Sequence, residues 1–200
     1  MSRSIEFHFD FRSPYSYLAH TQLPALAQRT SAQVSYHPFR ILELMQMVGN
    51  RPTTIECKNK GAYANGDLAR WANRYGVPMQ RNQHMREIDG AQLGRGVLVA
   101  GDRGQAPAYV EAVFAAMWRD PVNLAQRDRF VACLEAAEID GASLLDEADE
   151  PETIARLDQA TEAAAARGVF GSPTFFVGET MFFGNDRLDW VEHSLVAAAA

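Results

Sequence analysis

The stretch SIEFHFDFRSPYSYLA (residues 4–19) decides the fold, because it changes from one regular pattern to another within a few residues. Its first eight residues alternate strictly, with isoleucine or phenylalanine at every odd position and a polar residue at every even one. A period of two predicts a β-strand. Ser13 then stands where a helix N-cap belongs, and Pro14 suits a first helical turn, where a missing N–H costs nothing. The stretch therefore predicts a strand that passes directly into a helix.

The two ends of the chain carry complementary patterns. The helix is predicted to run through YSYLAHTQLPALAQR (15–29), kinked at Pro24, and QVSYHPF (33–39) is predicted as a second strand. Near the C-terminus, TFFVGETMFFG (174–184) holds two short apolar runs around a glycine, which predicts a β-hairpin. NDRLDWVEHSLVAAA (185–199) then predicts a closing helix capped by its first or second residue.

The middle of the chain is helical in pattern. Four segments space their apolar residues at helical intervals: DLARWANRYGVP (67–78), APAYVEAVFAAMWRD (106–120), DRFVACLEAAEI (128–139) and EPETIARLDQATEAAAARG (150–168). The order is β-α-β, a helical block of about 120 residues, then β-β-α. We therefore predict an α/β, thioredoxin-like fold with a large all-helical insertion. Residues 1–40 and 168–200 would form the discontinuous thioredoxin-like domain, and residues 41–167 the insertion, whose helices would cover one side of the sheet and leave a cleft at the boundary.

Composition excludes several classes of function. The 200 residues carry a net charge of -6 without a basic cluster, which argues against a nucleic-acid partner. No apolar run approaches the ~20 residues that cross a bilayer, and the start has no signal-peptide core, so we expect a cytoplasmic protein without a membrane partner. Cys57 and Cys133 are too few for a zinc site and improbable as a cytosolic disulfide, so no metal is expected.

The tetrapeptide Ser13-Pro14-Tyr15-Ser16 opens the first helix, where unpaired N–H groups favour an anion. Thiol oxidoreductases of this fold carry Cys-X-X-Cys there, and the serines exclude that chemistry. Ser13 could be a simple N-cap, worth ~1 kcal/mol, or a nucleophile, although no base accompanies it. It could also donate a hydrogen bond to the thiolate of a bound thiol such as glutathione. Such a bond contributes ~1.5–3 kcal/mol and would lower the thiol pKa by about one or two units.

A second motif, GVFGSPTFFVG (168–178), precedes the hairpin. Its Ser172-Pro173 bond could be an ordinary trans bond at an edge strand. The predicted topology favours a cis bond facing the helix N-terminus, which would let the Ser172 backbone pair with an extended ligand. Asn185 and Asp186 could cap the last helix and also hold a carboxylate and an ammonium group.

Five segments together resemble one enzyme family. They are FDFRSPYSYLA (9–19), GNRP (49–52), KNKGAYANGDLARWANRYGVP (58–78), RGVFGSPTFFVG (167–178) and MFFGNDRLDW (181–190). The chain looks like a 2-hydroxychromene-2-carboxylate isomerase, a glutathione-dependent family of aromatic catabolism that is related to kappa-class glutathione transferases and to DsbA. The resemblance covers nearly the whole chain.

The resemblance implies a role for each matching residue. Ser13 matches the serine that activates glutathione, and Ser172, beside Pro173, matches the residue whose backbone pairs with its cysteinyl unit. The other implied contacts are Asn185 and Asp186 to the γ-glutamyl group, Asn50 and Lys60 to glutathione and substrate, and Tyr15 and His84 to substrate. A histidine such as His84 is also common as an exposed or core-satisfied side chain.

One segment departs from the family pattern. NQHMREIDGAQL (82–93) has Asp89-Gly90 where relatives tend to have an Asn-Thr pair, and it lacks a nearby proline. Because this segment is expected to line the acceptor pocket, the departure bears on the substrate more than on the cofactor.

The implied activity is isomerisation of 2-hydroxychromene-2-carboxylate to trans-o-hydroxybenzylidenepyruvate by reversible thiolate addition, in a homodimer. A kappa-like glutathione transferase or peroxidase would use the same glutathione site. A non-catalytic, DsbA-like thiol-binding module would leave the pKa of the bound thiol unchanged. A transferase consumes glutathione and the isomerase does not, so an assay of glutathione consumption distinguishes these two. Titration of the bound thiol distinguishes the isomerase from the binding module.

Overall fold

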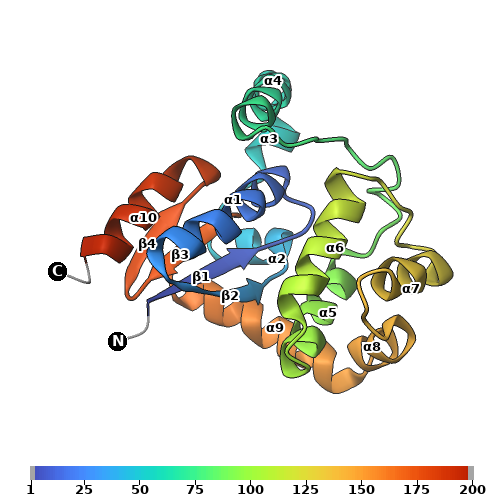
Figure 1. Ribbon diagram of the computed structural model, residues 1–200. Helices are drawn as coiled ribbons and strands as arrows, with labels where there is room; N and C mark the ends of the chain where they lie inside the picture. The colour runs from blue at the N-terminus through green and yellow to red at the C-terminus, as the bar shows by residue number, and fades with distance from the viewer. Residues whose placement is uncertain (1–2, 198–200) are drawn as a thin grey trace.

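A four-stranded mixed sheet forms the centre of the protein in the computed structural model, which describes residues 3–197. The strand order is β2-β1-β3-β4. β1 (Ser4–Phe9) runs parallel to β2 (Gln33–Pro38) and antiparallel to β3 (Thr174–Val177), which forms a hairpin with β4 (Thr180–Phe183). With α1 (Pro14–Thr30) between β1 and β2 and a helix after β4, this is a thioredoxin-like fold (Figure 1).

Eight helices lie between β2 and β3 in the described chain, and four of them overlap the four predicted helical segments. They are α2 (Ile41–Met47), α3 (Thr53–Glu56), α4 (Lys58–Tyr75), α5 (Gly90–Asp102), α6 (Ala106–Trp118), α7 (Arg127–Glu135), α8 (Gly141–Ala148) and α9 (Pro151–Ala166). After β4 the chain makes a 3₁₀ turn, η1 (Asn185–Arg187), and ends in α10 (Leu188–Ala197).

Both faces of the sheet are covered by inserted helices, so the prediction that they cover one side was wrong. On one face Phe9 packs against Phe114 of α6, with ring centroids 5.4 Å apart. On the other face Phe176 of β3 packs in a small core with Ala164 of α9 and Leu44 of α2. Figure 1 shows α1 and α9 on opposite sides of the sheet. The reason lies in β3, where the adjacent residues Phe175 and Phe176 point to opposite faces and give each face a bulky apolar side chain to bury.

The inserted helices share one core with the sheet. The main cluster of buried residues runs from Phe7 and Phe9 in β1 through Phe114 in α6 to Leu144 and Leu145 in α8. Apolar contact is therefore continuous between the sheet and the inserted helices that belong to these clusters. The boundaries at 40/41 and 167/168 remain a prediction.

The local signals at the first helix act as expected. Ser13 is the N-cap of α1, and Pro14 is its first residue. The helix continues through Pro24 to Thr30. At the other end of the chain, the prediction that Asn185 or Asp186 caps the closing helix was wrong, because both lie inside η1, whose N-cap position is a glycine without a capping side chain. Residues 198 and 199 of that predicted helix lie outside the described residues.

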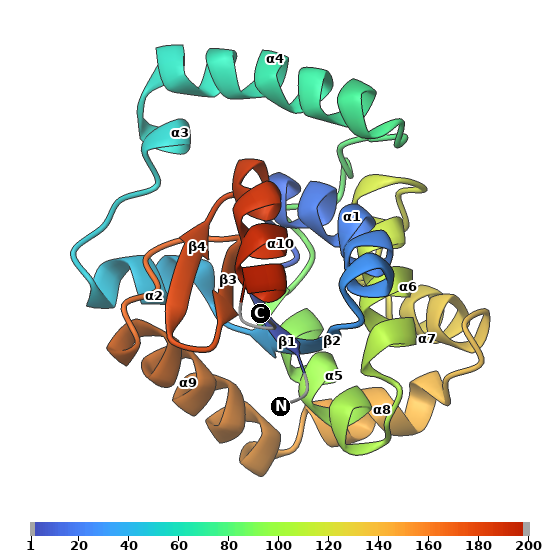
Figure 2. The ribbon, with the colours of Figure 1, turned by 60° about the vertical axis from the view of Figure 1, so that its left-hand side comes forward.

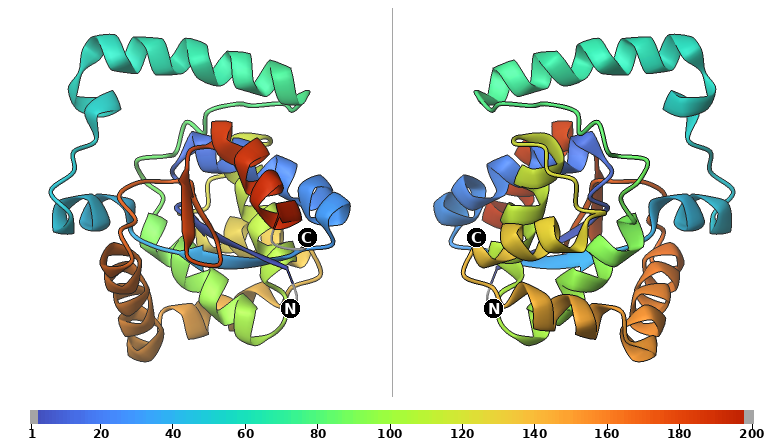
Figure 3. Two further views of the ribbon diagram at one scale, coloured as in Figure 1. Left: turned by 90° about the vertical axis from the view of Figure 1, so that its left-hand side faces the viewer. Right: turned by 90° about the vertical axis from the view of Figure 1, so that its right-hand side faces the viewer.

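Helices α3 and α4 form an arm on the outside of the molecule. Figures 2 and 3 show α4 lying across the top of the body, joined to it by extended segments at both ends. Within α4 only Ala72 is buried, near the C-terminal end that packs on the body. Among residues 3–197, no helix is both long and apolar enough to span a bilayer.

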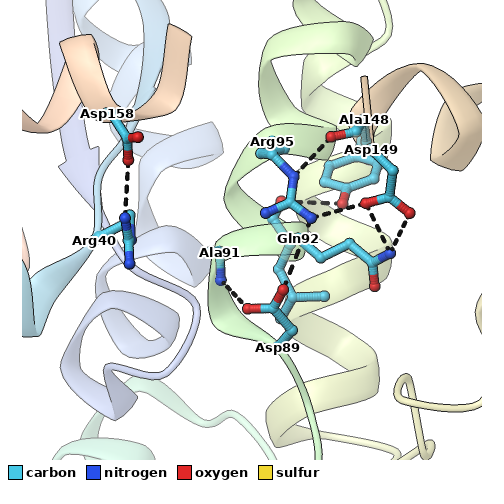
Figure 4. A network of polar contacts seen from close by, with 10 residues as sticks. Arg40, Asp89, Ala91, Gln92, Arg95, Ala148, Asp149 and Asp158 are labelled. Carbon is cyan, nitrogen blue, oxygen red and sulfur yellow. Dashed lines mark hydrogen bonds and ion pairs between the residues drawn. The ribbon is translucent and has the colours of Figure 1, made fainter. Parts of the chain in front are cut away.

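The divergent segment 82–93 is held by a polar network at the start of α5 (Figure 4). Asp89 caps α5 by accepting from the Ala91 N–H at 2.9 Å. Arg95, whose side chain is 11% exposed, donates to the Ala148 carbonyl at 2.7 Å and pairs with Asp149 at 2.8 Å. The Asp-Gly pair of this chain therefore starts a helix that is fixed to the loop between α8 and α9.

Candidate active site at the start of α1

Ser13 lies just beyond the C-terminal end of the central strand β1, and its side chain faces the segment that leads into β3. Its Oγ accepts a hydrogen bond from the Ser16 N–H at 3.2 Å, which is the capping bond. The same hydroxyl donates to the Ser172 carbonyl at 3.1 Å. The structure thus brings together two predicted site residues that are 159 positions apart.

The Ser172-Pro173 peptide bond is cis, as the topology predicts. The Ser172 side chain faces α1 as well: its Oγ accepts from the Asp10 N–H at 3.0 Å and lies 2.6 Å from the Ser16 Oγ. Ser16 is fully buried. Ser16, which stands where thiol oxidoreductases of this fold have their second cysteine, therefore also binds the cis-proline segment to the helix, a contact that no pattern in the sequence predicts.

Asp10 was also missed as a site residue. Its buried carboxylate accepts from the Arg12 N–H at 2.8 Å and from the Ile41 N–H at 3.0 Å. Burial raises the pKa of this carboxyl group, and the two backbone donors oppose that rise. Asp10 therefore ties the loop before Ser13 to the beginning of α2. The sequence signal was a polar residue at the end of an alternating strand, which by itself does not indicate such a bridge.

A pocket of about 380 Å³ opens between α1 and the α3–α4 arm. Tyr15 and Lys60, both predicted to contact substrate, line it together. The remaining lining residues are Thr54, Asn59, Tyr63 and Ala64. The pocket thus has two aromatic rings and one cation, a composition that suits an aromatic carboxylate.

The Tyr15 hydroxyl donates to Asp67 of α4 at 3.1 Å, which links the helix start to the arm. Burial and then the neighbouring Asp67 charge raise the pKa of Tyr15 to about 12. The phenol therefore stays protonated throughout the neutral range.

Asn185 and Asp186 lie in a second, smaller crevice of about 120 Å³ between α1, α4 and α10. Asn185 is buried. Its backbone carbonyl accepts from the Tyr75 hydroxyl at 3.1 Å, and its side-chain amide donates to the oxygen of that hydroxyl at 3.4 Å. Asp186 is exposed and pairs with Arg187 at 2.6 Å. Arg74 and Glu192 also line the crevice, so it presents charges of both signs.

Asn50 and His84, both predicted to contact a ligand, are not among the residues that line the two pockets. The Asn50 amide donates to the Phe170 carbonyl at 2.7 Å, which ties the loop after α2 to the segment before Ser172. His84 pairs with Glu87 at 3.1 Å. The roles of both residues remain predictions.

Comparisons with known proteins identify relatives over almost the whole chain. A family model described as a DsbA-like thioredoxin domain matches residues 4–196. A 2-hydroxychromene-2-carboxylate isomerase from Sphingobium xenophagum is 34% identical and covers 98% of this chain and 100% of that protein. A solved structure of a 2-hydroxychromene-2-carboxylate isomerase superposes with a TM-score of 0.88 at 31% identity, covering 98% of this chain and 96% of the other. Glutathione S-transferase kappa 1 from Homo sapiens is 25% identical and covers 98% of this chain and 92% of that protein.

Proposed function

Because the chain belongs to the 2-hydroxychromene-2-carboxylate isomerase family of DsbA-like thioredoxin proteins, we propose that it isomerises 2-hydroxychromene-2-carboxylate to trans-o-hydroxybenzylidenepyruvate with the help of glutathione. The observation that carries the proposal is the position of Ser13. A hydroxyl stands at the positive end of a helix and faces the residue before a cis-proline, without either cysteine of a disulfide catalyst. This arrangement can bind a sulfur anion but cannot form a disulfide of its own.

The backbone at Ser172 fits a peptide-like thiol. Among residues 3–197 its N–H has no acceptor, and its carbonyl accepts only the Ser13 hydroxyl. One free donor and one exchangeable acceptor on a single residue are what an extended ligand needs for strand-like pairing. Ser172 would hold the cysteinyl unit of glutathione, and the mixed-charge crevice at Asn185 and Asp186 would hold its zwitterionic γ-glutamyl end.

Glutathione, when bound, would supply a thiolate that adds to the conjugated double bond of the ring-opened substrate, so that the resulting single bond can rotate, and leaves again as the double bond re-forms. The chain's contribution starts with Ser13, whose single proton is donated to the Ser172 carbonyl. An amide N–H from the ligand at that carbonyl would replace this donor and leave the hydroxyl free to turn toward sulfur. Binding of the peptide and activation of the thiol would thus be coupled through one carbonyl oxygen.

The surroundings of Ser13 favour a negative charge. The first turn of α1 contains no acidic residue, and the N–H groups at a helix start carry a partial positive charge. Both oxygens of the Asp10 carboxylate accept hydrogen bonds from backbone N–H groups outside that helix, those of Arg12 and Ile41. Lys60, in the larger pocket, would hold the substrate carboxylate, while Tyr15 and Tyr63 would lie against its aromatic ring.

The test is a spectrophotometric isomerase assay with and without glutathione, on the wild type and on Ser13→Ala. We expect activity that requires glutathione without consuming it, and that falls in Ser13→Ala by about tenfold or more, the equivalent of one charged hydrogen bond. Activity that is indifferent to glutathione would contradict the mechanism. Net consumption of glutathione would favour a transferase, for which the kappa-class relative provides the precedent by name.

A further inference from the structure

A cluster of three metal-ligating side chains lies on the sheet face that α9 covers, away from α1. Glu6 and His8 both point to this face because they are two residues apart on β1. His37 lies directly opposite His8 on β2, and the two imidazole rings stack with centroids 4.6 Å apart. One ligating atom from each of the three residues lies within 4.8 Å of the other two.

The distances are close to those of a zinc coordination sphere. The Glu6 Oε2 is 3.3 Å from the His8 Nε2 and 3.9 Å from the His37 Nε2. Two ligands of a tetrahedral zinc ion, each at ~2.1 Å, lie about 3.4 Å apart. The first distance already matches. For the second, the His37 ring would turn out of its stack on His8 so that its Nε2 points at a shared ion, and its side chain, 41% exposed on an edge strand, is free to do so.

The ligating nitrogen of His37 has a neighbour whose hydrogen bond can change. The Ser35 hydroxyl lies 2.9 Å from the His37 Nε2, and it can donate to that nitrogen or turn away and leave the nitrogen lone pair to a metal ion.

We propose that Glu6, His8 and His37 form a binding site for Zn²⁺ or a neighbouring late first-row divalent cation. Two imidazoles and one carboxylate are a known zinc ligand set, and imidazole selects these ions over Mg²⁺ and Ca²⁺. The bound ion would join β1 to the edge strand β2 and so stabilise the pairing of these two strands. This site is independent of the proposed isomerase function.

Arg167 competes for the site. Its guanidinium binds the Glu6 carboxylate and lies over the Phe176 ring, 4.0 Å from the ring centroid. A bound cation would displace Arg167 from Glu6, while the contact with the ring can persist. Since a positive charge next to the ion opposes binding, Arg167→Met should tighten Zn²⁺ binding by about tenfold or more.

The experiment is calorimetric titration of Zn²⁺ into tag-free, chelator-washed protein near neutral pH, with Mg²⁺ as the contrasting ion. We expect one Zn²⁺ per chain and no Mg²⁺. His8→Asn and His37→Asn should each weaken binding by about tenfold or more, whereas His193→Asn, an exposed histidine on α10, should leave it unchanged. Zn²⁺ should also raise the thermal unfolding temperature of the wild type and not that of His37→Asn.

Three results would overturn the proposal. One is the absence of Zn²⁺ binding by the wild type, even if Arg167→Met binds it, since the arginine would then close the site in the natural chain. Another is binding that survives His37→Asn. The third is more than one ion per chain with no dependence on either histidine, which indicates adventitious surface binding. If the buried His8 variant does not fold, the half-exposed His37 decides the test.

Discussion

Ser13→Ala separates two roles that one hydroxyl plays in this structure. The side chain accepts the capping bond from the Ser16 N–H and donates to the Ser172 carbonyl. Alanine removes both bonds and keeps the backbone and the Cβ. A structural role predicts only a loss of stability, whereas the proposed function also predicts a change in the acidity of bound glutathione.

The loss of stability follows from the two bonds. An N-cap side chain contributes about 1 kcal/mol, and one further neutral hydrogen bond contributes about 1 kcal/mol. We therefore expect the free energy of unfolding to fall by about 2 kcal/mol. Asp140 is a matched control, because it caps α8 by accepting from the Ser143 N–H at 3.1 Å and lies far along the chain from the site. Asp140→Ala should lower stability by about 1 kcal/mol and leave the bound thiol unchanged.

The free energy that the Ser13 hydroxyl gives to a bound thiolate is expected to exceed the ~1 kcal/mol of the N-cap bond. A hydrogen bond to a charged group contributes ~1.5–3 kcal/mol, and one pKa unit corresponds to ~1.4 kcal/mol. Without the Ser13 hydroxyl, the pKa of bound glutathione should rise by about one to two units. Ser13→Thr, which keeps the hydroxyl, should restore most of the difference.

Two measurements check these values. Denaturant unfolding gives the free energy of unfolding of each variant, compared at the same dependence on denaturant concentration as the wild type. Titration of the thiolate absorbance in the ultraviolet gives the pKa of glutathione in each complex. If Ser13→Ala loses stability as calculated while the thiol keeps its wild-type pKa, then Ser13 is a cap alone and the proposed activation is wrong. If neither quantity changes, the geometry at the start of α1 is also wrong.

Three further predictions concern packing, pH and the larger pocket. A Cβ on Gly96 would overlap the buried Tyr109 hydroxyl, so Gly96→Ala should lower the free energy of unfolding in urea by about 3 kcal/mol. Gly101→Ala on the same helix meets nothing within 4 Å and should raise that free energy by up to about 1 kcal/mol. His8 has a folded pKa of about 4 and an unfolded value of 6.5, so the unfolded chain binds more protons between these values. Stability should therefore fall by about 3 kcal/mol as the pH drops from 6.5 to 4, and His8→Asn should flatten that part of the pH profile of unfolding. Tyr15→Phe should raise the KM several-fold with little change in kcat, and since the phenol titrates only near pH 12, wild-type activity should show no loss from Tyr15 below about pH 11.

The sequence by itself determined the four strands, the first helix, four of the eight inserted helices and one half of the site. Alternation in residues 4–11 and the Ser13-Pro14 pair predict β1, the N-cap and α1, and the structure confirms them. These features are local: a strand period, a capping side chain and a proline at a first turn depend only on neighbours in the chain. The hairpin after Ser172 is predictable on the same ground, with Gly178 at its turn in a conformation, φ of 59°, that suits glycine.

Tertiary structure alone decided how the two halves of the site, the start of α1 and the segment at Ser172, come together. Ser16 contacts Ser172 across 156 positions of sequence, and Asp10 reaches the start of α2. Asn185 was predicted as a cap and is instead buried against Tyr75 of the arm. The cross-strand cluster of Glu6, His8 and His37 exists only in the register of β1 with β2. Each contact depends on which element packs on which, and no local periodicity encodes that choice.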